Sequence, residues 1–170
     1  MMGMQTDVKS GHLNNTGFML LGRTRIKALS TVGSATAGTL DIFDTTTVPV
    51  TDATYARSGT TVTVTKTSHG LVTGDVRGFA FASASGVSAT NGNYSITRVD
   101  ANSFTLVDIN SGTIAASTAM SYSTRWVTSY DVGATDVFGN IVLIPGEGVL
   151  IYNGIYMILT NITSANIYYG

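Results

Sequence analysis

The chain of 170 residues contains no cysteine, only two prolines and few charged residues. The absence of cysteine excludes a disulfide-stapled scaffold, thiol catalysis and thiolate metal sites. Charged residues make up 11% of the chain, against about 25% in an average soluble domain. Nine basic and ten acidic residues give a net charge of -1, so no basic excess exists to neutralise nucleic-acid phosphates. Hydrophobic residues reach 44%, which is too many for a disordered chain.

The low charge has a consequence for the surface of the protein. A free monomer with so little surface charge would be poorly soluble. We therefore expect other subunits to cover much of the surface, in a homo-oligomer for which a trimer is favoured. The alternative is a neutral monomer solvated by its many Thr, Ser, Asn and Gly residues. Neither a nucleic acid nor a membrane is expected as a partner.

The most apolar segment, residues 141–159, does not predict a membrane-spanning helix. It contains Pro145-Gly146 and Asn153-Gly154, which are turn signals, and one charge, Glu147. Two hairpins explain the segment without forcing a proline, several glycines and a glutamate into one helix. The N-terminus has no basic region followed by an apolar run, so no signal peptide is expected.

Alternating Thr and Val residues, punctuated by Gly and Asn-Gly, predict an all-β chain with little or no helix. The composition changes twice: residues 53–123 are rich in Thr, Ser, Ala and Gly, and the chain after them is aromatic and aliphatic. Strands predicted before residue 53 lack partners there, and the later segments can supply them. We therefore predict a jelly-roll-like β-sandwich of residues 1–52 and 124–170, with a small β-barrel of residues 53–123 inserted into a loop. The strands predicted for the sandwich are 18–21, 40–43, 125–130, 141–144, 149–152, 155–159 and 165–169.

The middle segment contains short motifs in a fixed order. They are an alternating Thr/Val strand at 59–65, His69-Gly70-Leu71 with Gly74-Asp75, Asn91-Gly92 with Tyr94 and Ile96, and Ser-Phe-Thr-Leu at 103–106. This series resembles a small β-barrel module of phage tail and virion proteins. It is similar in pattern to the first catalytic cysteine half-domain of ubiquitin-activating enzymes. The resemblance implies a fold and says little about activity.

The outer segments carry a second resemblance. Residues 6–10, 22–27 and 144–149, with the terminal Tyr-Tyr-Gly, are similar to short β-sandwich virion proteins of tailed bacteriophages. The resemblance implies a structural protein of the phage particle, made in the cytoplasm of the bacterial host. A capsid decoration or cement protein that contacts the major capsid protein is favoured. A tail, neck or fibre component is the alternative, because the middle module is commonest in tail-associated proteins.

Groups suited to catalysis are few. Glu147, the only glutamate, lies in a Pro-Gly-Glu-Gly turn. His69, with Ser68 and Asp75 nearby, could form a relay, but no nucleophile-elbow motif accompanies it. The preferred interpretation is that His69 orders a turn through backbone hydrogen bonds. Two distant histidines make no local zinc site, and calcium and phosphate motifs are absent. We predict no enzyme activity, no cofactor and no metal.

A function of another class is carbohydrate binding. Trp126, Tyr130 or Tyr152 could then provide a stacking platform for a sugar ring. An exposed aromatic shelf would support this alternative, and a buried Trp126 would argue against it.

One candidate interface is a basic strip. Arg23, Arg25 and Lys27 occupy alternate positions, so in a strand they share one face while Thr24, Ile26 and Ala28 share the other. The strip either contacts an acidic patch on a neighbouring subunit or forms the solvated face of an edge strand.

The other candidate interface is apolar. Residues 149–152 and 155–159, interpreted as a hairpin around Asn153-Gly154, have no polar face. Antiparallel strands with one solvated face should alternate in polarity. We therefore expect one face to meet another copy of the chain, through Tyr152, Ile155, Tyr156 and Met157. The alternative is a central strand pair shielded by the inserted module.

Overall fold

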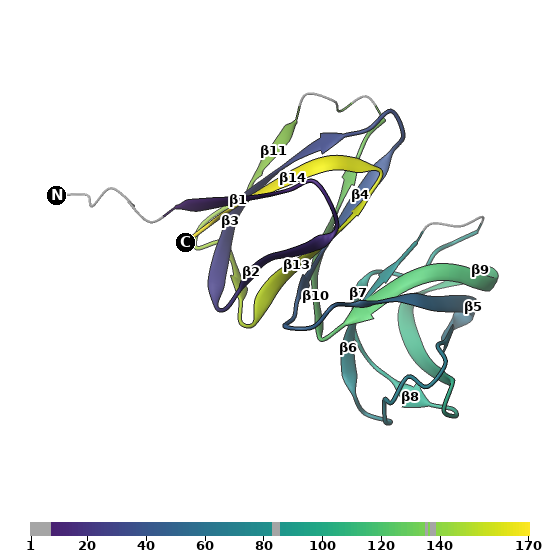
Figure 1. Cartoon of the computed structure of the whole chain (residues 1–170). Helices are drawn as coiled ribbons and strands as arrows, with labels where there is room; N and C mark the ends of the chain where they lie inside the picture. Colours follow the sequence, from purple (N-terminus) through teal and green to yellow (C-terminus); the bar gives the residue numbers. More distant parts are fainter. Residues whose placement is uncertain (1–7, 83–85, 135, 137–138) are drawn as a thin grey trace. The chain divides into compact units, whose positions relative to one another are not determined.

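The computed structural model describes residues 8–82, 86–134, 136 and 139–170. These residues form fourteen strands and no helix (Figure 1), which confirms the prediction of an all-β fold. Residues 6 and 7, which begin the first of the outer motifs, lie outside the described part of the chain. The chain divides into two compact units, Met1–Thr46 with Ser129–Gly170, and Thr47–Thr128. We call them the sandwich unit and the barrel unit.

The sandwich unit contains two sheets. Sheet A has the order β1 (Lys9–Leu13), β14 (Ile162–Tyr169), β3 (Thr24–Gly33) and β11 (Asn140–Leu143), and β12 (Val149–Ile151) also pairs with β3. Sheet B has the order β10 (Arg125–Val132), β4 (Gly38–Asp44), β13 (Gly154–Thr160) and β2 (Gly17–Leu21). All the pairings within sheet A are antiparallel.

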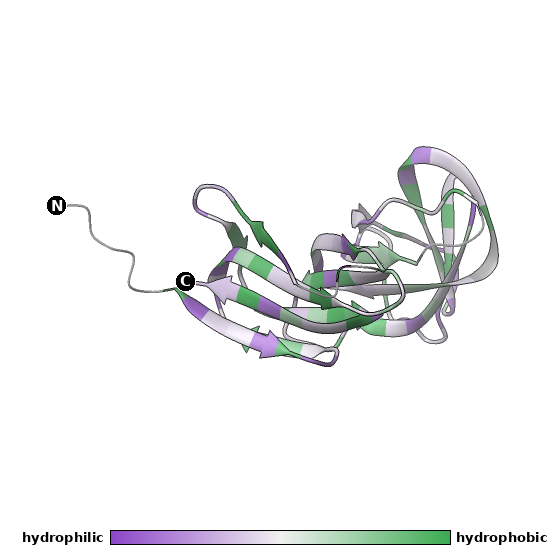
Figure 2. Cartoon of the chain, turned by 90° about the horizontal axis from the view of Figure 1, so that it is seen from above, coloured by the Kyte–Doolittle hydropathy of each residue, from purple (hydrophilic) through white to green (hydrophobic). Residues whose placement is uncertain are grey.

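Hydrophobic and hydrophilic residues alternate along strands of the sandwich unit (Figure 2). Since successive side chains of a strand point to opposite faces, the hydrophobic ones form the core. In sheet B, Met157 lies opposite Ile42, and both side chains are fully buried. In sheet A, Ile167 lies opposite Leu29, and both are buried. The face of sheet A opposite to this core is called its outer face.

The predicted hairpin around Asn153-Gly154 is wrong. β12 pairs with β3 in sheet A, and β13 pairs with β4 and β2 in sheet B, so the connection crosses from one sheet to the other. A two-residue hairpin with Asn-Gly needs positive φ, which neither Asn153 nor Gly154 adopts.

The carboxylate of Asp44, a fully buried side chain at the end of β4, holds this crossing in place. It accepts the backbone N–H groups of Tyr152 (3.0 Å), Asn153 (2.8 Å) and Gly154 (3.3 Å).

The barrel unit is built around one long strand. β9 (Ser103–Ser123) pairs along its length with β5 (Val50–Thr65), near its start with β8 (Thr97–Arg98) and near its end with β6 (Val76–Phe81), which also pairs with β7 (Gly92–Ser95). The sheet forms a nearly closed barrel. Aromatic rings fill it: Phe79 lies 6.1 Å from Phe104 and 5.8 Å from Tyr122 between ring centroids.

The barrel unit extends beyond the predicted limits of 53 and 123, to Thr47 and Thr128. At its start, Val50 of β5 lies opposite Tyr122 of β9. At its end, the backbone of residues 125 and 126 passes directly over Gly78 of β6, where a Cβ atom would overlap the backbone nitrogen of Trp126. Composition alone does not reveal either contact.

The variant Gly78→Ala is expected to destabilise the barrel unit by about 2–3 kcal/mol, because a rigid backbone must move to admit one methyl group. Chemical unfolding followed by the fluorescence of the single tryptophan, Trp126, measures the loss. Gly92→Ala, in the same unit, is the matched control, since a Cβ there approaches only the side chain of Tyr94, at 3.2 Å. Equal stability of the two variants would contradict the close contact at Gly78.

Candidate docking surface

The basic strip lies on the outer face of sheet A. Arg25 and Lys27 are half-buried in β3 and alternate with the buried residues Thr24 and Ile26, whereas Arg23 precedes the strand and is exposed. β3 has β14 on one side and β11 and β12 on the other. The interpretation of the strip as the face of an edge strand is therefore wrong, because β3 lies inside the sheet.

A β-bulge changes the facing of Ala28. Tyr168 lies opposite Ala28 and Tyr169 lies opposite Ile26, so β3 has one extra residue, Lys27, at this step. A bulge of this kind leaves two successive residues on the same side. Ala28 and Lys27 consequently line the same hollow, whereas strict alternation placed Ala28 on the opposite face.

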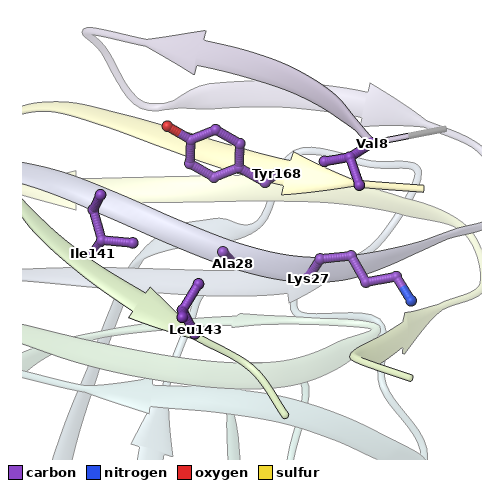
Figure 3. Close-up of a pocket in the computed structure, with 6 residues that line it drawn as sticks. All are labelled: Val8, Lys27, Ala28, Ile141, Leu143 and Tyr168. Carbon is purple, nitrogen blue, oxygen red and sulfur yellow. The ribbon is translucent and has the colours of Figure 1, made fainter. Parts of the chain in front are cut away.

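An apolar hollow of about 300 Å³ opens on this face (Figure 3). Ala28 forms its floor, and Ile141 and Leu143 of β11 lie opposite Tyr168 of β14 across β3. Val8 and Lys27 complete the lining. Ile141 is 65% exposed and Leu143 is 76% exposed. Exposed apolar side chains gathered around a hollow are typical of a surface that contacts another molecule.

Sequence reasoning missed this hollow. It identified residues 141–144 as a strand and did not predict that its side chains would be exposed. The available signal was the short apolar run without a polar residue, in a chain segment between two glycine-rich turns.

Two residues of the basic strip, Arg25 and Lys27, donate hydrogen bonds to the turn after β11. The Lys27 ammonium donates to the backbone carbonyl of Glu147 (2.9 Å), and Arg25 donates to the carbonyl of Gly148 (3.5 Å). The Arg25 Nε also lies 3.8 Å from the Glu147 carboxylate, whose side chain is 85% exposed. Lys27 thus lines the apolar hollow, and Arg25 and Arg23 precede it along the chain. With three cations and the one carboxylate of Glu147, the strip carries a net positive charge.

A polar ladder crosses the same face beside the hollow. The amide nitrogen of Asn166 donates to Ser30 Oγ (3.2 Å), and its oxygen lies 2.9 Å from His12 Nδ1. The amide thus separates the imidazole from the hydroxyl. This order does not suit nucleophile activation, which needs the base in direct contact with the hydroxyl.

The predicted apolar interface is wrong for three of its four residues. Ile155 and Met157 have no exposed surface, and Tyr156 is 7% exposed. β13 is a central strand, and the ring of Tyr156 packs edge-on against Phe18, with ring centroids 4.8 Å apart. The chain itself covers both faces of this strand, so its lack of a polar face needs no second copy. Tyr152, at the crossing between sheets, is 58% exposed.

His69 in the barrel unit orders a turn. Leu71 N–H donates to His69 Nδ1 (3.0 Å), so the other ring nitrogen carries the proton and donates to the carbonyl of Asp100 (2.9 Å). Both ring nitrogens thus bind backbone groups. Asp75 instead accepts the N–H of Val72 (3.2 Å). The structure does not assemble the relay considered from the sequence.

The three aromatic residues considered for sugar stacking differ in exposure. Trp126 and Tyr130 are half-buried, and Tyr152 is exposed. The Asn93 side chain bonds to both the N–H (2.8 Å) and the carbonyl (2.9 Å) of Trp126. Trp126 belongs to the barrel unit, and Tyr130 and Tyr152 belong to the sandwich unit.

In the described part of the chain, no three His, Asp or Glu side chains gather where a metal ion could bind. Nor does that part contain a helix long and apolar enough to cross a membrane. No protein-family model matches the chain, and searches of curated proteins and of solved structures find no match. The outer face of sheet A is therefore the best-defined candidate site.

Proposed function

We propose that the chain is a non-enzymatic structural protein of a tailed-phage particle, and that it decorates the capsid by docking through the outer face of sheet A. The observation that carries the proposal is the apolar hollow lined by Lys27, which is the last residue of the basic strip. The sequence resemblance of the outer segments to short β-sandwich virion proteins supports the same role.

The hollow and the strip suit two kinds of contact with one partner. An apolar side chain of the partner fills the hollow and removes Ile141 and Leu143 from water. Carboxylates beside it pair with the basic strip and fix the orientation, as charged rims do at interfaces. Each contact is small, but many copies on a repeating lattice give a high total avidity.

The triple variant Arg23→Gln, Arg25→Gln and Lys27→Gln is expected to fold normally and to occupy the particle about ten-fold less at physiological salt. Binding of the wild-type protein should weaken as salt rises, because ions screen rim charges over about 8–10 Å. Co-sedimentation of the purified protein with particles that lack it measures occupancy. Gln at Lys66, Arg77 and Arg98, which belong to the barrel unit, is the matched control.

Cryo-electron microscopy of intact particles distinguishes the possible locations. Density for the chain repeated over the capsid lattice supports decoration, and a single ring at the neck or tail supports the alternative role. Absence of the chain from purified particles, or full occupancy by the triple variant at every salt concentration, contradicts the proposal.

A further inference from the structure

β11 forms one edge of sheet A and is only four residues long. Among the described residues, no strand pairs with its far side (Figure 1). Residues 140–144 contain no charge and no proline. Natural edge strands usually carry such residues to prevent pairing with another chain. The short length of β11 and Pro145 after it limit the edge, but its unpaired N–H and C=O groups remain a template for pairing with another chain.

The direction of the backbone N–H and C=O groups determines which residues of β11 can bond to another strand. Ile144 N–H donates to the carbonyl of Lys27 (2.9 Å), so Ile144 is bonded towards β3. Alternate residues of an antiparallel strand bond to opposite sides. Ile141 and Leu143 therefore present their N–H and C=O groups to the free edge, and their side chains are the exposed ones.

We infer that β11 pairs with β11 of a second copy, antiparallel, about a two-fold axis at Val142. In this register Ile141 lies opposite Leu143 of the other copy, and the two pairs exchange four backbone hydrogen bonds. The outward N–H and C=O groups of Ile141 meet those of Leu143, and the side chains of these two residues lie side by side across the contact. A two-fold contact between identical patches is the commonest form of protein dimer.

Charge favours this edge contact over a face-to-face contact. Neighbouring strands lie about 4.8 Å apart, so the two copies of β3 would be separated by about 14 Å across the joined edges. Salt largely screens the two basic strips from each other at that distance. Stacking the outer faces at about 10 Å would instead interleave Arg25 and Lys27 of both copies. The contact gives a dimer, in place of the trimer that the sequence favoured.

Pairing through β11 is independent of docking on a particle. Pairing uses the edge of β11, and docking uses the face of the sheet, so either can fail alone. Dimerisation of the purified protein without any particle present tests the pairing by itself.

Sedimentation equilibrium of the full chain tests whether the dimer exists. The wild-type protein is expected to have twice the monomer mass, and Ile141→Lys, which places a cation on the edge, is expected to halve it. Val99→Lys, at a residue 61% exposed in the barrel unit, is the matched control and should leave the mass unchanged. Circular dichroism verifies that both variants fold. A monomeric wild-type protein, or a dimer that survives Ile141→Lys, overturns the inference.

A cysteine tests the register, because the chain has none of its own. Residues facing across a two-fold axis as a non-hydrogen-bonded pair have Cα atoms about 4.5 Å apart, within the range of a disulfide. Val142→Cys should therefore cross-link under mild oxidation at least ten-fold more than Val99→Cys. Equal cross-linking of the two variants overturns the axis at Val142.

Discussion

Removing the carboxylate of Asp44 is expected to cost the sandwich unit about 3–5 kcal/mol of unfolding free energy. In Asp44→Ala, the N–H groups of Tyr152, Asn153 and Gly154 lose their acceptor. A hydrogen bond to a charged group contributes about 1.5–3 kcal/mol, and a buried donor left without a partner costs about 1–3 kcal/mol. Gly154 is buried, so water cannot replace the lost oxygen there.

Hydrogen exchange of the β4 and β13 amides measures this loss, because the only tryptophan lies in the other unit. Asp44→Asn is expected to lose less, since one side-chain oxygen can still accept from Asn153 and Gly154. Asp131→Ala, which removes an exposed carboxylate of β10 in the same unit, is the control. Exchange rates in Asp44→Ala that match those of Asp131→Ala would show that the Asp44 carboxylate does not hold the crossing.

The second large effect is expected at Arg57 in the barrel unit. Arg57 and Asp108 form an ion pair at 3.1 Å, and neither side chain has any exposed surface. The guanidinium also donates to the backbone carbonyls of Gly59 (3.2 Å), Val87 (3.1 Å), Ser88 (2.6 Å) and Asn110. Arg57→Met is expected to cost about 3–5 kcal/mol, because it leaves a buried carboxylate without its cation.

Urea unfolding followed by Trp126 fluorescence measures that cost. Arg98→Met, at an exposed residue of β8, is the matched control and should change stability by less than about 0.5 kcal/mol. A loss below about 1 kcal/mol in Arg57→Met would contradict the role of the ion pair.

The pair also predicts acid sensitivity of the barrel unit. Burial raises the pKa of Asp108, but the backbone N–H groups of Thr90 and Asn110, the Thr90 hydroxyl and the Arg57 cation together lower that pKa further, so the net shift is downward. A carboxyl whose folded pKa is lowered contributes stability above its ordinary pKa of about 3.9, and that stability is lost as pH falls through the folded value. The Asp108→Asn variant should therefore lose less stability between pH 5 and pH 2 than the wild-type protein. An identical pH profile would contradict this source of the sensitivity.

Local patterns in the sequence predicted the described strands of the sandwich unit except β1 and β3. Residues 40–43 fall within β4, residues 155–159 within β13 and residues 165–169 within β14. Alternation and turn signals are properties of neighbouring residues, so one sequence suffices to find them. The partner of each strand depends on contacts between distant segments. The Asn153-Gly154 turn signal therefore predicted a hairpin where the chain crosses between sheets.

The candidate site was predictable only in part, for the same reason. Alternation correctly placed Arg25 and Lys27 on the face opposite to Ile26. The hollow depends on a bulge opposite Tyr168 and Tyr169 and on β11 ending the sheet, and neither is visible in a single segment. The pairing of Arg57 with Asp108 likewise joins residues that are remote along the chain.

Because the barrel unit is inserted into the sandwich unit, the strands of the sandwich unit leave the ribosome in two separate groups. Of the strands that surround β3 and β4 in their sheets, only β1 and β2 are made before the barrel unit, and β10 to β14 are made during its last residues or after it. Synthesis at about 5–20 residues per second leaves the early strands waiting about 4–16 s while residues 47–128 are made. The barrel unit can thus fold first on the nascent chain, while the apolar face of β4 remains exposed to chaperones until β13 emerges.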